Sequence, residues 1–143
     1  MPTVTVTRRV HFNAAHRLHS PRLTEEDNQR VFGPCANPNY HGHNYELDIS
    51  VEGPVDPVTG YVVDLGVVKR IAEETVIAVL DHKNLNLDVP AFRELNPTAE
   101  NIAVVIWHLL ADALPGRLVK IVLWETPRNY VEYRGPGTGI PNT

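Results

Sequence analysis

The chain has 143 residues, of which 43% are apolar and 21% charged, and these values suit one globular domain with a hydrophobic core. Its formal net charge of -4 argues against a general nucleic-acid binder, which would show a basic face, so we expect no nucleic-acid partner. A single cysteine cannot form an internal disulfide, the N-terminus does not read as a signal peptide, and no apolar run approaches the roughly 18 residues of a membrane span. We therefore expect a cytoplasmic protein without membrane contact.

Two segments alternate between apolar and polar residues and are predicted to be strands. In residues 3–16 the apolar residues fall at alternate positions, and His16 lies in the same alternating series. In residues 41–53 the side chains of His41 and His43 lie on the apolar face, opposite a polar face. This pattern is typical of half-buried antiparallel strands.

Two helices and two further strands are predicted after these. Asp64 is a plausible N-cap for a helix that runs to about Leu80, and Thr98 can cap a second helix. Strands are expected at 118–126 and 130–134. The order ββααββ predicts an α+β fold in which two helices cover one face of a four-stranded antiparallel sheet.

We expect one domain over residues 1–135 and a flexible tail over 136–143. Residues 17–40 form a long irregular connection with room for a short helix, and residues 81–97 form a polar connection. An open antiparallel sheet leaves two edges exposed, and these invite pairing with neighbouring subunits. An oligomer that closes its sheets into a barrel would remove both edges.

Three histidines are candidate metal ligands. His41 and His43 are two residues apart on a predicted strand, so both rings project from one face, and His16 can converge with them if the two strands pair. Three neutral imidazoles with an open fourth position are the ligand set of a catalytic zinc, whereas a structural site usually closes the shell with cysteine. Imidazole also suits copper, nickel and iron, so zinc is the favoured metal rather than the only candidate.

Cys35 lies in a loop a few residues before the His-X-His pair. A nearby zinc ion and histidine would lower the pKa of its thiol, and the resulting thiolate could act as a base. The alternative is a small buried apolar side chain, which is the usual fate of a free cysteine. The spacing alone leaves both interpretations open.

Two carboxylates are also candidates. Asp81 precedes His82 at the end of the first predicted helix, where it could fix the tautomer of the histidine and raise its basicity. The alternative is that His82 only stabilises the helix C-terminus. Glu125 continues an inward apolar row and therefore needs a partner or a polar ligand, unless the strand has reached solvent there. Its two oxygens would match a heterocycle edge with two adjacent N–H donors.

These features belong to seven segments that form one pattern, at residues 12–18, 31–35, 37–45, 56–60, 80–85, 97–101 and 124–126. The pattern resembles the 6-pyruvoyltetrahydropterin synthase family, including its bacterial 6-carboxytetrahydropterin synthase branch, over about residues 5–135. The resemblance implies the tunnelling fold (T-fold), a single catalytic pterin-synthase domain, and a homohexamer of two stacked trimers.

The resemblance also implies roles for particular residues. The zinc ligands would be His16, His41 and His43. The catalytic base would be Cys35, with Asp81 and His82 completing a triad at a subunit boundary. The pterin ring would be anchored by Glu125, in a pocket that is also lined by Thr98 and Glu100.

The implied reaction converts 7,8-dihydroneopterin triphosphate to 6-pyruvoyltetrahydropterin and releases triphosphate. The alternatives are 6-carboxytetrahydropterin synthesis for 7-deazaguanine (queuosine) production, and a non-catalytic pterin- or metal-binding module. Arg17, Lys83 and Arg128 are candidates for holding the triphosphate because they lie next to the motifs. Ala99 departs from the hydroxyl residue that relatives often carry there, so one pterin contact would be missing.

Overall fold

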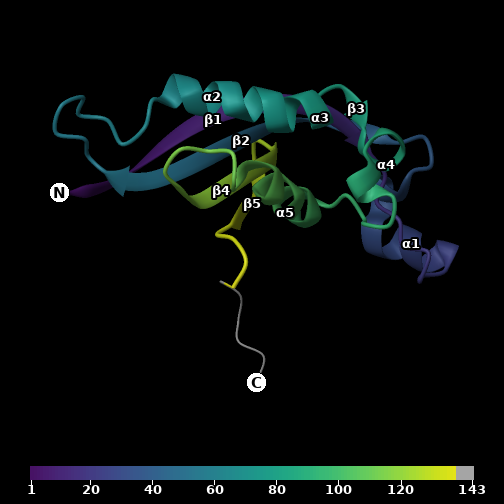
Figure 1. Ribbon diagram of the computed structural model, residues 1–143. Helices are drawn as coiled ribbons and strands as arrows, with labels where there is room; N and C mark the ends of the chain where they lie inside the picture. Colours follow the sequence, from purple (N-terminus) through teal and green to yellow (C-terminus); the bar gives the residue numbers. More distant parts are fainter. Residues whose placement is uncertain (138–143) are drawn as a thin grey trace.

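The computed structural model describes residues 1–137, which form one five-stranded sheet with helices packed against it (Figure 1). The strands are β1 (Thr3–His16), β2 (His41–Pro54), β3 (Lys83–Asn84), β4 (Arg117–Thr126) and β5 (Asn129–Tyr133). The α-helices are α1 (Glu25–Phe32), α2 (Leu65–Ala72), α3 (Ala78–Leu80), α4 (Leu85–Asp88) and α5 (Ala99–Leu110). The helical turns are the 3-10 turns η1 (Gly33–Ala36) and η3 (Pro90–Phe92) and the π turn η2 (Glu73–Ile77).

The two long strands β1 and β2 pair antiparallel along their whole length, with Thr3 opposite Pro54 and His16 opposite His41. Every second residue is buried from Val10 to His16 of β1 and from Tyr45 to Ile49 of β2, as the alternating sequence predicted, whereas the first residues of β1 are exposed. The register matters for function because it places the end of β1 against the start of β2. The histidines of the two strands therefore meet at one end of the sheet.

The sheet has the order β3-β1-β2-β4-β5, so the predicted count of four strands was one too low. The extra strand, β3, has only two residues and pairs parallel with Ala14 and Ala15. A two-residue strand carries no hydrophobic period, so the sequence showed only the polar connection in which it lies. The α+β class and the order of the larger elements are confirmed.

Both long helical segments begin where their capping residues predicted. The carboxylate of Asp64 accepts a 2.8 Å hydrogen bond from the backbone N–H of Gly66, and α2, η2 and α3 continue as one helical run to Leu80. The hydroxyl of Thr98 accepts a 3.2 Å hydrogen bond from the N–H of Asn101 at the start of α5. Local sequence therefore sets both helix starts.

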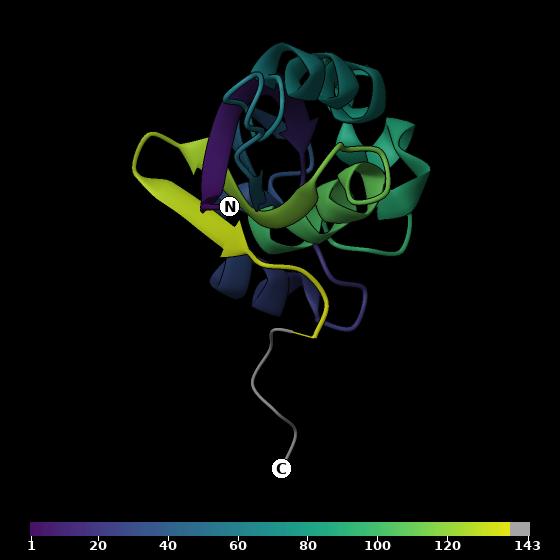
Figure 2. The same ribbon diagram turned by 60° about the vertical axis from the view of Figure 1, so that its left-hand side comes forward.

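The core lies between the sheet and these helices. Helix α2 packs against β1, and α5 packs against β4 and β5 (Figure 2). Fully buried apolar side chains come from every layer, including Leu47 of β2, Val68 of α2 and Ile106 of α5. In residues 1–137, no helix has both the length and the apolar character needed to cross a membrane. We expected a flexible tail at residues 136–143, and residues 138–143 of it lie outside the described residues. The domain limits stay a prediction.

Candidate metal centre and active site

The three candidate histidines converge at the end of the sheet where β1 meets β2. One ring nitrogen from each of His16, His41 and His43 lies within 4.8 Å of the others. The ring centroids of the three pairs are 4.6, 5.2 and 5.0 Å apart. The cluster follows from the register, because His16 and His41 are direct partners and His43 is two residues further along the same face.

His16 is held in one orientation by a residue distant in sequence. Its Nδ1 lies 2.8 Å from the carbonyl oxygen of Pro97, and a carbonyl can only accept, so Nδ1 carries the proton. The Nε2 lone pair is then directed toward His41, whose Nε2 is 3.0 Å away. Burial is the main cause that lowers the pKa of His16 from 6.5 to about 4, so the ring is neutral near pH 7.

The donor set fits a bound transition metal. Burial lowers the pKa of His41 as well, so it too presents a neutral imidazole. His43 Nε2 is a buried atom with no hydrogen-bond partner within the described residues, which is costly unless a ligand satisfies it. Tetrahedral coordination by imidazole places neighbouring nitrogens about 3.3 Å apart, close to the spacing of His16 and His41. The cluster can therefore bind a metal ion through three imidazoles.

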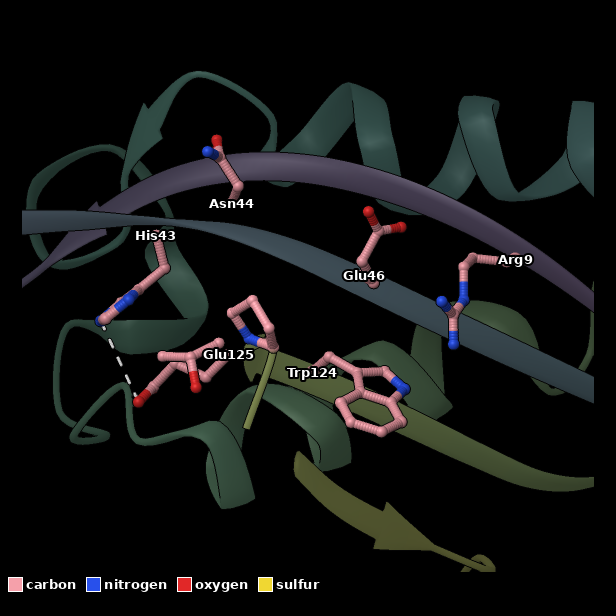
Figure 3. Close-up of a pocket in the computed structure, with 8 residues that line it drawn as sticks. Arg9, His43, Asn44, Glu46, Trp124 and Glu125 are labelled. Atoms are coloured by element: carbon pink, nitrogen blue, oxygen red, sulfur yellow. Dashed lines mark ion pairs between the residues drawn. The ribbon is translucent and has the colours of Figure 1, made fainter. Parts of the chain in front are cut away.

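A pocket of about 600 Å³ adjoins the cluster on the side of His43 and Glu125 (Figure 3). Its lining residues are Arg9, His43, Asn44, Glu46, Trp124, Glu125, Thr126 and Pro127. Glu125 reaches from β4 toward β2, and its Oε1 lies 4.0 Å from His43 Nε2. The predicted inward carboxylate is therefore partly buried, at the wall of a pocket and beside the metal-binding cluster.

Cys35 lies in η1, close enough to Glu125 and Tyr45 to interact with them electrostatically. Its carbonyl accepts a 2.7 Å hydrogen bond from Leu18 N–H, and the Nε–H of Arg17 donates to the neighbouring carbonyl of Ala36 at 2.9 Å. Burial raises the pKa of the Cys35 thiol, and the charge of Glu125 raises it further. The lowering of this pKa that we expect from a bound zinc ion stays a prediction.

Asp81 and His82 form the expected pair, but not beside Cys35. Asp81 Oδ2 is 2.9 Å from His82 Nδ1, and Asp81 Oδ1 accepts a 2.9 Å bond from the backbone N–H of Asn13. The Asn13 bond is the main cause that lowers the pKa of Asp81. Asp81 and His82 directly precede β3, and no hydrogen bond or ion pair among residues 1–137 joins either of them to Cys35. Their expected union with Cys35 in one triad stays a prediction.

Thr98 and Glu100 flank the metal-binding cluster from another side. Thr98 directly follows Pro97, the partner of His16, but its hydroxyl is used to cap α5. Glu100 is exposed in the first turn of that helix. Neither residue lines the pocket that contains Glu125, and their expected contact with a pterin ring stays a prediction.

Tyr45 lies beside the histidine cluster and is not among the site residues expected from the sequence. It stacks on Phe12 with ring centroids 4.8 Å apart, and its ring lies 5.7 Å from that of His43. Its hydroxyl is buried without a hydrogen-bond partner among the described residues. Burial raises the pKa of Tyr45, as do the nearby Glu125 and Cys35. The sequence did indicate its position, because Tyr45 falls on the same face of the strand as His41 and His43.

Comparison with known proteins places this arrangement in a family. Residues 5–136 match the family model described as 6-pyruvoyl tetrahydropterin synthase. The chain belongs to the 6-pyruvoyl tetrahydropterin synthase family. The match includes β1 and β2, which carry the three clustered histidines. It also includes η1 and β4, and β4 carries Glu125.

Members of this family with similar sequences and structures agree over nearly the full length. The chain is 48% identical to the human 6-pyruvoyl tetrahydrobiopterin synthase over 131 residues, which is 91% of this chain and 90% of that protein. It is 44% identical to the protein of the same name from Drosophila melanogaster, over 94% of this chain and 82% of that protein. The structure of the Caenorhabditis elegans 6-pyruvoyl tetrahydropterin synthase superposes with a TM-score of 0.89 at 39% identity, covering 94% and 97% of the two chains.

Proposed function

We propose that this protein is a zinc-dependent lyase that converts 7,8-dihydroneopterin triphosphate to 6-pyruvoyltetrahydropterin and releases triphosphate. The observation that carries the proposal is the convergence of His16, His41 and His43 at a pocket wall that also holds Glu125. Sequence identity of 48% to a human synthase, with about nine-tenths of both chains covered, supports the same activity.

The proposed metal is zinc, held by the three imidazoles with a fourth position open to substrate. When bound, zinc supplies a Lewis acid that polarises substrate hydroxyls and acidifies the bonds beside them. His16 can serve as a ligand at neutral pH because Pro97 fixes its proton on Nδ1 and leaves Nε2 free.

The other site residues have separate tasks. We assign Glu125 to the pterin ring, because its carboxylate can accept two parallel N–H donors from a guanidine-like edge. Cys35 takes a proton from the substrate side chain, and His82, oriented by Asp81, moves a proton at the same centre. Electrons lost by the side chain are gained by the ring, so the conversion needs no nicotinamide.

We propose that the working form is a homohexamer of two trimers with active sites at subunit interfaces. Two features of the described residues support it. Residues 3–13 of β1 have no strand partner on the side away from β2, and β5 has none beyond β4, so both edges of the sheet can pair with neighbours. In addition, no hydrogen bond or ion pair among residues 1–137 joins Asp81 or His82 to Cys35, so we assign their meeting to the boundary between two subunits.

A cytoplasmic location fits the single Cys35, because a reducing compartment keeps a thiol free for proton transfer. Pterin triphosphate is the only substrate class we propose, and no nucleic acid is involved. Thr98 and Glu100 would complete the pterin pocket from a neighbouring subunit.

The deciding experiment identifies the product. Purified zinc-loaded protein is incubated with 7,8-dihydroneopterin triphosphate and magnesium, and the products are analysed by mass spectrometry. A 6-pyruvoyl product with free triphosphate supports the proposal. A 6-carboxy product with acetaldehyde would replace it by the 6-carboxytetrahydropterin synthase activity, and no turnover at full zinc occupancy would favour a binding module.

A further inference from the structure

A second pocket, of about 890 Å³, lies beside Pro97, the hydrogen-bond partner of His16. We call it the arginine pocket, and its lining residues are Arg17, His19, Ser20, Pro21, Arg22, Tyr40, Asn86, Phe92, Arg93, Glu94, Leu95, Asn96 and Pro97. Four separate segments of the chain contribute to it, so no single sequence motif describes it. It shares no lining residue with the Glu125 pocket.

The arginine pocket is positively charged, although the chain as a whole carries a net charge of -4. Arg17, Arg22 and Arg93 line it together with one carboxylate, Glu94. Arg17 lies 3.6 Å from Glu25, which also contacts His19. Arg22 and Arg93, by contrast, have no ion-pair partner among residues 1–137 and are exposed. Planar guanidinium groups that lack a carboxylate partner are suited to binding phosphate oxygens.

The arginine pocket is connected directly to the metal-binding cluster. Pro97 lines the pocket and its carbonyl oxygen accepts the hydrogen bond from His16 Nδ1. Tyr40 and Arg17, which also line it, are the chain neighbours of His41 and His16. The cluster therefore adjoins both pockets: His43 lines the pocket that contains Glu125, and Pro97, the partner of His16, lines the pocket with three arginines.

The proposed substrate consists of a ring with N–H donors, a hydroxylated side chain and a polyphosphate. These three groups match, in the same order, the Glu125 pocket, the metal-binding cluster and the arginine pocket. We propose that the arginine pocket binds the triphosphate group, with Arg22 and Arg93 as its principal contacts. The inference rests on the proposed function for its substrate, but its chemistry, recognition of an inorganic polyphosphate, can be measured without turnover. Lys83 and Arg128 line neither pocket and are not part of this site.

The test compares two double variants of the full-length, zinc-loaded protein. Arg22→Gln/Arg93→Gln removes the two unpaired guanidinium groups of the pocket. Arg30→Gln/Arg70→Gln removes the same charge from exposed positions on α1 and α2 and serves as the control. Calorimetry measures binding of inorganic triphosphate and of 7,8-dihydroneopterin without phosphates, and steady-state kinetics measure KM and kcat for the triphosphate substrate.

We expect the first double variant to weaken binding of inorganic triphosphate at least ~10-fold and to raise KM by a similar factor, because charge-assisted hydrogen bonds are lost. The affinity for 7,8-dihydroneopterin and the value of kcat should stay within about twofold, since interactions made equally in the ground and transition states affect KM alone. Added salt should raise the KM of the unmodified protein more than that of the variant.

Two results would overturn the inference: unchanged triphosphate binding in Arg22→Gln/Arg93→Gln, or an equal loss in the control variant. Failure of the proposed function looks different. If the unmodified protein bound inorganic triphosphate through Arg22 and Arg93 but did not turn over the substrate, the activity would be refuted and the anion site retained. Normal turnover with an unchanged KM in the first variant would refute the anion site alone.

Discussion

His16 on β1 lies directly opposite His41 on β2, and their Nε2 atoms are 3.0 Å apart. This relationship joins the two longest strands of the sheet to the candidate metal centre. It depends on the β1–β2 register, because a slip of one residue would turn one histidine to the opposite face. The hydrogen bond from His16 Nδ1 to Pro97 then settles which nitrogen is available to a metal.

Replacing a ligand should remove the metal without unfolding the chain. We expect His41→Ala to reduce zinc affinity by more than about a hundredfold, since a three-histidine site loses a third of its protein ligands. Metal content after dialysis, measured by mass spectrometry, checks this. His108→Ala is the control because His108 is exposed on α5, away from the cluster. Stoichiometric zinc in His41→Ala would contradict the ligand assignment.

Removing the proposed base should separate chemistry from metal binding. In Cys35→Ala we expect turnover to fall by at least about a hundredfold, as is usual for loss of a general base. Zinc content should not change, because Cys35 is not among the three clustered ligands. Kinetics and metal analysis on the same preparation check both points. Full activity in this variant would rule out Cys35 as the base.

Mixed oligomers can test whether the triad is shared between subunits. Cys35→Ala and His82→Ala should each be inactive alone, because each removes one member from every site. Co-expressed with different affinity tags and purified as hybrids, the two chains should recover activity at about a quarter of the sites, where an intact Cys35 meets a neighbour's intact His82. Hybrids as inactive as their parents would show that each chain supplies its own triad.

The buried hydroxyl of Tyr45 should reduce stability. In Tyr45→Phe the stacking on Phe12 is retained and an unpartnered polar group is removed, so we expect the free energy of unfolding to rise by about 1 kcal/mol. Urea unfolding of the metal-free protein measures it. Tyr61→Phe, at a position that is 59% exposed, should have no effect. A loss of stability in Tyr45→Phe would indicate a partner for the hydroxyl.

The ion pair between Arg9 and Asp48 predicts a specific dependence of stability on pH. Arg9 Nε and Nη2 donate to the two oxygens of Asp48 at 2.6 and 3.0 Å, and this lowers the pKa of Asp48 below 3.8. Because the folded state has the lower pKa, the ion pair stabilises the fold above about pH 4 and its contribution is lost as the pH falls through the folded pKa. We expect Asp48→Asn to cost up to about 1 kcal/mol near pH 7 and almost nothing in acid.

Unfolding curves at several pH values check this prediction. The control is Asp112→Asn, because Asp112 is exposed and has no ion-pair partner within the described residues. If Asp48→Asn were equally destabilising at acidic and neutral pH, the loss would come from altered packing beside Trp124 rather than from the charge of Asp48.

Local patterns were enough to predict most of the elements. The alternation of residues 3–16 and 41–53 identified β1 and β2, and the caps Asp64 and Thr98 identified the helix starts, because strand faces and cap hydrogen bonds depend on near neighbours in sequence. Strand β3 was missed because two residues paired with a distant strand leave no periodic pattern.

The sequence by itself determined which residues could form the site. These are three histidines at core-facing strand positions, a free Cys35, and Glu125 at the end of a series of core-facing apolar residues. Only the tertiary structure decided how they meet. It brought Pro97 to His16 across 81 residues, paired the two residues of β3 with β1, and gathered the arginine pocket from four segments. These contacts are set by strand register and by the packing of distant segments, which no short-range period in a sequence encodes.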